Sequence, residues 1–316
     1  MSRTFVARAA LGLLAVGMLC LPAFVTGYVV YIANITLVYI VLALGMHILT
    51  GEAGQFALSH AASYGIGIYT AAILNKFAWG VFPLPILAGG LVAGVLGLLI
   101  GLVALRMRDI YLALATFAFG QAMQWVFLNW KSVTGGPNGT EIHPTSLFGI
   151  EILNDKQAYL LVLALTAALV YATLLLSRSR LGSALRAVRE SEVAALAVGV
   201  DVRGVKLVAF VLSGVYAGLA GGVFTLFSTF IGPDSLGFQT TIFVLTMVVV
   251  GGLGSVTGAI SGAVIMSLSS EMLRSALSYQ EIIYGALLMG FMMYASGGIL
   301  DLARRLWRRG SLPANV

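Results

Sequence analysis

Charged side chains are scarce in this sequence, and their scarcity excludes an ordinary soluble domain. Asp, Glu, Lys and Arg make up 9% of the 316 residues, against roughly a quarter in soluble domains. Hydrophobic residues make up 59%, and the mean hydropathy is +0.99. Because so few charges cannot cover the surface of a globular domain of this size, the composition indicates a polytopic membrane protein.

The residues that enzyme and metal sites need are also few. The single cysteine, Cys20, excludes an intrachain disulfide and a multi-cysteine metal site. His47, His60 and His143 have no Cys or carboxylate at ligand spacing, so no metal is expected. The sequence contains no phosphate-binding G-x-x-x-x-G-K-S/T loop, and no nucleophile stands at motif spacing from a base. We therefore expect no enzyme and no cofactor bound by this chain.

Ionisable residues are absent over long stretches, and these stretches indicate the membrane spans. A bilayer core about 30 Å thick needs about 20 apolar residues per helix, so breaking the runs at Gly and Pro predicts about ten transmembrane helices. The predicted ranges are 9–26, 29–49, 57–75, 84–105, 110–129, 158–177, 207–230, 240–253, 257–273 and 281–299. The runs lack the alternation of barrel strands, so the predicted fold is an all-α polytopic bundle.

The basic residues predict how the bundle lies in the membrane, because short cytoplasmic loops retain Lys and Arg. With both termini in the cytoplasm, 14 of the 18 basic residues lie inside. The four left outside are Lys76, Lys131, Lys156 and Arg274. Arg3 and Arg8 precede an apolar run, as in a signal peptide, but no clear cleavage site follows, so we expect a retained first helix. The net charge of +6 therefore reflects orientation in a membrane, and nucleic-acid binding is not expected.

The chain is predicted to form one transmembrane domain over 1–316 with two long polar connections. Residues 130–157 are dense in Gly, Pro, Asn and Thr and are predicted to be an external loop. Residues 178–206 are predicted to be a cytoplasmic loop, because basic residues gather there.

Two glycine-rich segments interrupt the apolar runs, "TGEAGQFALSH" at 50–60 and "VGGLGSVTG" at 250–258. They share a G-x-x-G spacing followed by a polar residue, which gives Gly51, Gly54 and Gln55 in the first and Gly251, Gly254 and Ser255 in the second. Paired breaks in transmembrane helices point to a transport pathway. The alternative is two tight helix turns or a close helix crossing. The predicted topology places both breaks on the same face, so no inverted repeat is inferred.

The loop stretch "ALRAVRESEVAALAVGVDVRGVK" at 184–206 predicts a short capped helix. Ser191 stands at the N-cap, Glu192 in the first turn and Gly199 at the end. Residues 193–198 are apolar on nearly every side, so a cover is expected. The cover is either an anionic membrane surface or a groove in a partner protein. An ordinary basic loop held to the membrane is the third interpretation.

The segment 180–224 resembles the cytoplasmic loop and following span of permease subunits of branched-chain amino acid ATP-binding cassette importers, in particular the LivM type. Four further stretches resemble the same family in the same order: "GQFALSHAASYGIGIYTAAIL" at 54–74, "RMRDIYLALATFAFGQ" at 106–121, "TGGPNGT" at 134–140 and "VGGLGSVTGAISGAVI" at 250–265. The resemblance covers most of the chain from about residue 40 to about residue 300. It implies an importer permease bundle.

This resemblance implies that the loop is a coupling segment whose helix docks into a cleft of an ATPase. The implied coupling residues are Arg186, Arg189, Glu190, Glu192, Ala194, Ala195, Leu196 and Gly199. The implied partners are a second, LivH-type permease, two cytoplasmic ATPases that use ATP and Mg, an external substrate-binding protein and membrane lipid. The implied location is the bacterial inner membrane. The implied substrates are Leu, Ile and Val, while urea, short amides and other small solutes remain alternatives.

The remaining candidates include two pathway residues, Glu52 and Tyr64. An ionisable group at membrane depth is a candidate functional residue by default, and Glu52 is one such group. The alternative is that Glu52 lies at the inner membrane interface and has no role in transport. Glu271 and Arg274, three apart, are interpreted as a local ion pair. An ion-coupled secondary carrier is the competing class and predicts a buried Asp, Glu or His relay, whereas the acids here stand mostly in loops or at helix ends.

Overall fold

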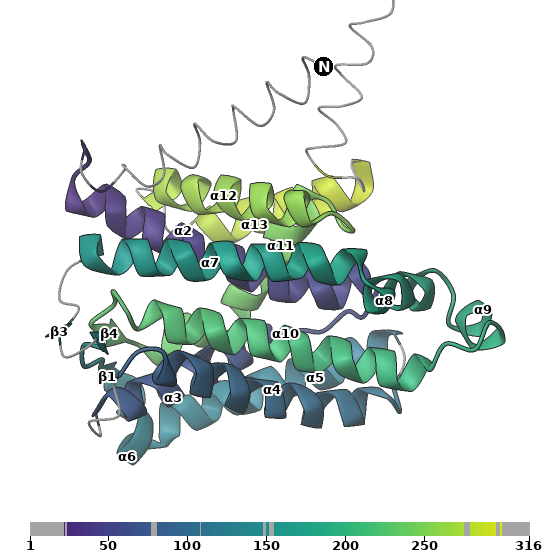
Figure 1. The fold of residues 1–316 in the computed structure, drawn as a ribbon, viewed down its shortest axis with the longest axis horizontal. Helices are drawn as coiled ribbons and strands as arrows, with labels where there is room; N and C mark the ends of the chain where they lie inside the picture. The colour runs from purple at the N-terminus through teal and green to yellow at the C-terminus, as the bar shows by residue number, and fades with distance from the viewer. Residues whose placement is uncertain are drawn as a thin grey trace, which may run out of the picture.

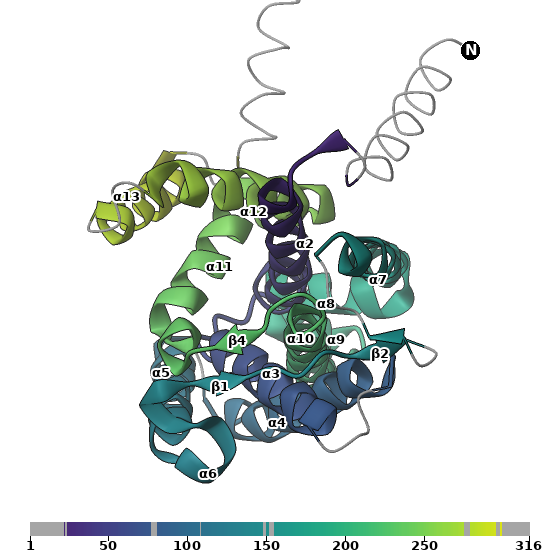
Figure 2. The ribbon, with the colours of Figure 1, turned by 90° about the vertical axis from the view of Figure 1, so that its left-hand side faces the viewer.

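The computed structural model describes residues 22, 24–76, 81–107, 109–147, 150–151, 155–274, 279–294 and 298. Within these ranges the long helices are α2 (Gly27–Met46), α3 (His60–Lys76), α4 (Leu84–Ala104), α5 (Asp109–Asn129), α7 (Asp155–Arg178), α10 (Val202–Phe224), α11 (Phe238–Gly251), α12 (Val256–Met272) and α13 (Gln280–Tyr294). Most of them run side by side along one axis (Figure 1), whereas α11 runs across that axis (Figure 2). The fold is therefore mostly helical, as the sequence predicts.

Short elements close the two ends of the bundle. One end, called the α9 end below, carries the π-helix η1 (His47–Glu52), α8 (Arg180–Glu190) and α9 (Glu192–Ala197). The other, called the strand end, carries α6 (Lys131–Thr134), η2 (Gly136–Asn138), η3 (Pro233–Leu236) and the strands β1 (Thr140–Glu141), β2 (Ser146–Leu147), β3 (Ile150–Glu151) and β4 (Phe230–Ile231). Figure 1 shows α8 and α9 at the right and the strands at the left.

Each predicted span from 29–49 to 281–299 overlaps one of the long helices. The first predicted span, 9–26, falls almost wholly outside the described residues. Five of the described helices are long and apolar enough to cross a membrane by length and composition. They are Gly27–Glu52, Leu84–Ala104, Ile110–Asn129, Asp155–Arg178 and Val202–Phe224. α10 begins five residues before its predicted span of 207–230, because Asp201 caps it by accepting from the Gly204 amide at 3.2 Å.

The centre of the bundle is α10, which packs mainly against α4, α3 and α2. Figure 2, which looks along the helices, shows α10 between them. A Cβ on Gly218 of α10 would overlap the Gly89 carbonyl of α4, and one on Gly67 of α3 would overlap the Gly218 carbonyl. One on Gly89 would lie 2.8 Å from the Gly67 carbonyl oxygen. Three helix backbones therefore meet where no side chain fits, the kind of contact that packs helices in lipid.

The strand end joins two connections far apart in the sequence. β1 pairs antiparallel with β4, placing Thr140 opposite Ile231 and Glu141 opposite Phe230. β2 and β3 form a second small pair. The predicted loop 130–157 thus contains short helices and strands, and β1 ties it to the connection that follows α10.

Candidate functional site

The predicted capped helix forms as α9. Ser191 Oγ accepts from the Ala194 amide at 3.3 Å, and Gly199 ends the segment with a φ of 84°. Residues 180–190 form a second helix, α8, where the sequence predicts a loop. The Ser179 hydroxyl caps α8 by accepting from the Gly182 amide at 3.2 Å. The signal for α8 was this N-cap serine two residues after the apolar span ends.

α9 presents large apolar side chains to its surroundings. Val193 is 79% exposed, Leu196 60% and Val198 78%, whereas Ala195 is buried against the bundle. Figure 1 shows α9 projecting beyond the end of the long helices. Glu192 and Lys206 form an ion pair of 2.5 Å, which ties α9 to the first turns of α10. The exposed apolar surface is therefore held in place rather than free to fold back.

Glu52 is buried and binds the end of η1 to α7 and α8. Arg186 Nη1 donates to Glu52 Oε2 at 3.0 Å, and Ser177 Oγ donates to Oε1 at 2.6 Å. The fully buried His47 lies with its Nε2 3.6 Å from Oε1. Arg186 also donates to the Ser177 carbonyl at 2.8 Å. These four side chains, His47, Glu52, Ser177 and Arg186, are called the polar clasp below.

Arg189 lies between the two glycine-rich interruptions. Its Nη1 donates to the Gly51 carbonyl. A Cβ built on Gly54 would lie 2.8 Å from Arg189 Cγ, and one built on Gly254 would lie 2.8 Å from Nη1. Gly54 and Gly254 have φ values of 67° and 97°, which favour glycine. Both interruptions thus lie at the α9 end, as the predicted topology requires.

The second interruption is also a close helix crossing. A Cβ on Gly251 would overlap the Gly258 carbonyl, so α11 and α12 approach backbone to backbone there. Ser255 Oγ caps α12 by accepting from the Gly258 amide at 2.8 Å. The segment 250–258 is therefore a tight turn and a close helix crossing, which was the alternative to a pathway element.

The other predicted residues are scattered. Tyr64 is buried, with its ring edge-to-face against Phe224 at 6.2 Å. Gln55 is partly exposed and donates to the Ala53 carbonyl at 3.4 Å. Glu190 and Ala194 are exposed on the α8–α9 segment. Glu271 and Arg274 form the expected local ion pair, at 3.4 Å.

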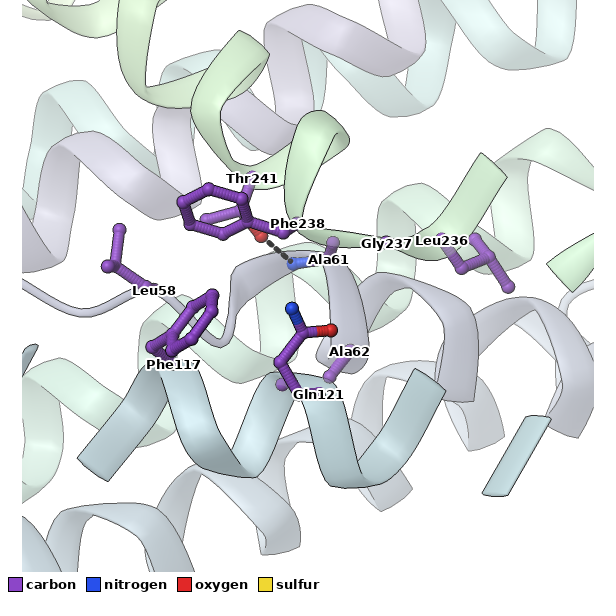
Figure 3. A pocket seen from close by; sticks show the side chains of 10 residues that line it. Leu58, Ala61, Ala62, Phe117, Gln121, Leu236, Gly237, Phe238 and Thr241 are labelled. Atoms are coloured by element: carbon purple, nitrogen blue, oxygen red, sulfur yellow. Dashed lines mark hydrogen bonds between the residues drawn. The ribbon is translucent and has the colours of Figure 1, made fainter. Parts of the chain in front are cut away.

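A small hollow at the N-terminal end of α3 was not predicted. It is lined by residues of α5, η3 and α11 (Figure 3). Thr241 Oγ1 accepts from the Ala61 amide at 3.1 Å, and Thr116 Oγ1 accepts from the Leu58 amide at 2.9 Å. Figure 3 shows the Gln121 side chain of α5 extending toward this first turn. The Thr241 hydroxyl thus satisfies a first-turn backbone donor that α3 itself leaves free, and the Thr116 hydroxyl satisfies a donor in the segment just before α3.

Among the described residues no group of three or more His, Cys, Asp or Glu side chains is placed to hold a metal ion.

A bundle of apolar helices, five of them long and apolar enough to cross a membrane within the described residues, defines the class of multi-pass membrane proteins. A family model described as the branched-chain amino acid transport system permease component matches residues 28–296. The chain belongs to this family. It is therefore a multi-pass membrane protein and a transport permease rather than an enzyme, as the sequence predicts.

Individual relatives give the same assignment. The chain is 33% identical over 311 residues to the high-affinity branched-chain amino acid transport system permease protein LivM of Escherichia coli, covering 90% of this chain and 72% of the relative. The Salmonella typhimurium LivM protein has the same identity and coverage. The Escherichia coli LivH permease is 25% identical over 283 residues, covering 83% of this chain and 91% of the relative. No solved structure matches. The resemblance to LivM-type permeases is thereby confirmed.

Proposed function

We propose that this chain is the LivM-type permease subunit of an ATP-binding cassette importer, and that α9 docks into a cytoplasmic ATPase. The observation that carries the proposal is the apolar surface formed by Val193, Leu196 and Val198, which is called the α9 surface below. Exposed apolar patches on a rigid element mark binding sites. A short amphipathic helix in a groove is a common mode of protein recognition.

A partner protein suits the α9 surface better than the membrane does. α9 projects along the helix axes, beyond the end of the bundle, rather than lying against its lipid-facing sides (Figure 1). The α9 end also carries a concentration of basic residues, which favours the cytoplasmic side. In the described residues these are Arg106, Arg178, Arg180, Arg186, Arg189, Arg203 and Lys206.

The assembly in this proposal contains a second, LivH-type permease, two ATPases and an external binding protein. Similarity to both LivM and LivH proteins supports a two-permease system. ATP and Mg are used by the ATPases, and the binding protein meets the strand end of the permeases. The assembly lies in the bacterial inner membrane, with both termini of this chain in the cytoplasm.

The proposed substrates are the branched-chain amino acids Leu, Ile and Val. The proposal is supported by the names of the relatives, which are branched-chain amino acid transport permeases. A zwitterionic solute also suits a bundle with few fixed charges. The glycine interruptions are proposed to border the pathway at its α9 end, since Arg189 lies beside both. Glu52 and Tyr64 are buried, so they are proposed to support the pathway indirectly, Glu52 by binding Arg186 and Ser177 and Tyr64 by packing against Phe224.

Leu196→Asp is the experiment that tests docking. We expect this variant to reach the membrane in normal amount and to retain less than about one tenth of the ATPase that co-purifies with wild type, because a carboxylate would be buried in an apolar groove. Co-purification of the tagged chain from its native membrane measures this. Leu196 is preferable to Glu192, because replacing Glu192 would also break the ion pair with Lys206.

Arg180→Asp is the matched control, since it changes the charge at an exposed position in the first turn of α8, where the helix dipole favours an acid. It should retain the ATPase. If wild type brings down no ATPase, the importer proposal fails and an ion-coupled carrier takes its place. If Leu196→Asp retains the ATPase, α9 is not the docking surface.

A further inference from the structure

The resemblance assigns Arg189 to ATPase docking. The residue is exposed, yet part of its side chain lies against the bundle. Its aliphatic part rests at Gly54, and its guanidinium reaches Gly254 and donates to the Gly51 carbonyl. Gly51 lies within η1 and Gly54 just after it, whereas Gly254 lies in the connection after α11, far away in the sequence. The three apolar side chains of the α9 surface lie on a different helix. These contacts give Arg189 a place within the permease in addition to its place on the exposed surface.

Electrostatics explains why one guanidinium suits this position. The last carbonyls of a helix have no donor within the helix, and they carry the negative end of the helix dipole. Gly51 lies in the last turn of η1, and Gly254 lies three residues beyond the end of α11 at Gly251. Arg189 therefore places a positive charge at the C-terminus of η1 and beside the connection that follows α11. A charge-assisted hydrogen bond of this kind is stronger than a neutral one.

Glycine at positions 54 and 254 leaves just enough room for the Arg189 side chain. A Cβ at Gly54 or at Gly254 would displace the Arg189 side chain, and both residues hold left-handed backbone conformations. The neighbouring Arg186 anchors the same helix to the buried Glu52. α8 is thus fixed to the end of η1 by two of its own arginines, one of which also reaches the connection after α11.

We propose that Arg189 is a positioning residue for transport, a latch that joins the α8–α9 segment to both glycine interruptions. A displacement of α9 would pass through α8 and Arg189 to the ends of α2–η1 and α11 together. Without the guanidinium, α9 would still bind its partner, but the two helix ends would no longer follow it. This inference rests on the proposed function and deepens it, because it separates docking from transmission.

The first test compares Arg189→Met, which keeps the aliphatic part against Gly54, with Arg189→Lys, which keeps the charge. The matched control is Arg180→Met on the same helix, since Arg180 is exposed and makes no hydrogen bond or ion pair within the described residues. Each variant is purified with its accompanying subunits, and leucine uptake into proteoliposomes, ATP hydrolysis and the amount of ATPase are measured.

We expect Arg189→Met to lower uptake at least about tenfold, the equivalent of one lost charged hydrogen bond, while the bound ATPase and its hydrolysis remain. Arg189→Lys should recover part of the uptake, and Arg180→Met should match wild type. Wild-type uptake by Arg189→Met would overturn the proposal. So would loss of the ATPase from that variant, because Arg189 would then belong to the docking surface.

The second test needs no ATPase. Spin labels on Phe56→Cys and Thr257→Cys, both exposed beside the two interruptions, report the distance between them once Cys20 is replaced by Ser. Arg189→Met should broaden the distance distribution in the purified protein, and Arg180→Met should not. An unchanged distribution would overturn the latch. This outcome is independent of whether wild type carries an ATPase, so failure of the latch and failure of the proposed function are distinguishable.

Discussion

Gly218→Leu is expected to prevent correct assembly of the bundle. The new side chain would enter the crossing of α10 with α4 and α3, where a Cβ on Gly218 would overlap the Gly89 carbonyl and lie 2.5 Å from the Ala93 Cβ. Backbone carbonyls cannot turn aside as a flexible side chain can, so whole helices would have to separate. Overpacking costs roughly 1–3 kcal/mol in ordinary cores, and we expect a cost at or above the top of that range here.

The measurement is the yield of monodisperse protein from detergent-solubilised membranes, together with its thermal unfolding midpoint. Gly218→Ala should give an intermediate loss, because the smaller side chain already overlaps the same carbonyl. Gly285→Leu on α13 is the control, since nothing lies within 4 Å of a Cβ built there. A Gly218→Leu protein that elutes and unfolds like wild type would contradict the described crossing.

Glu52→Ala is expected to detach the α8–α9 segment while leaving the long helices in place. It removes the acceptor for Arg186 and Ser177 and leaves the buried His47 without its carboxylate neighbour. Breaking a buried ion pair costs roughly 3–5 kcal/mol. The Arg186 side chain is 42% exposed, so it can regain water, and we expect a loss of about 2 kcal/mol in the free energy of unfolding.

A double-mutant cycle with Arg186→Met separates this pair from the rest of the clasp. The double variant should be less destabilised than the sum of the two single variants, because the second change removes a charge that the first left unpaired. Glu190→Gln, on the exposed side of the same segment, is the control and should be neutral. Additive effects would mean that Glu52 and Arg186 do not act together.

Glu52→Gln also tests whether the protein is an ion-coupled carrier instead of an importer permease. An ion-coupled carrier would use a buried carboxylate as a proton relay, and uptake by the variant would then lose its dependence on a pH gradient. In the importer, uptake by Glu52→Gln should fall in proportion to the loosening of the α8–α9 segment and should stay dependent on ATP. Uptake of labelled leucine with and without an imposed gradient tells these results apart.

Sequence reasoning was most successful where the signal is local. The charge-free runs located the long helices, and the Ser191 cap with the Gly199 end located α9. It was less successful at α8, because a short amphipathic helix between two spans resembles a charged loop when only charge is counted. The start of α10 was placed too late for a similar reason, since Arg203 and Lys206 lie on the helix rather than before it.

The candidate site was only partly visible in the sequence. Glu52 and Arg186 were each singled out, but nothing in their positions showed that they meet. The spacing of Gly51 with Gly54 and of Gly251 with Gly254 suggested a shared role, yet glycine at a turn and glycine at a helix crossing look the same in a sequence.

The sequence by itself determined that this protein is a bundle of apolar helices with a short capped helix in its basic loop, since hydropathy and capping act over a few neighbouring residues. Only the tertiary structure decided what the glycines and arginines do. Gly67, Gly89 and Gly218 come from three helices, and Arg189 meets Gly54 and Gly254 from opposite halves of the chain. Such contacts depend on how the helices are placed relative to one another, and no local pattern records that placement.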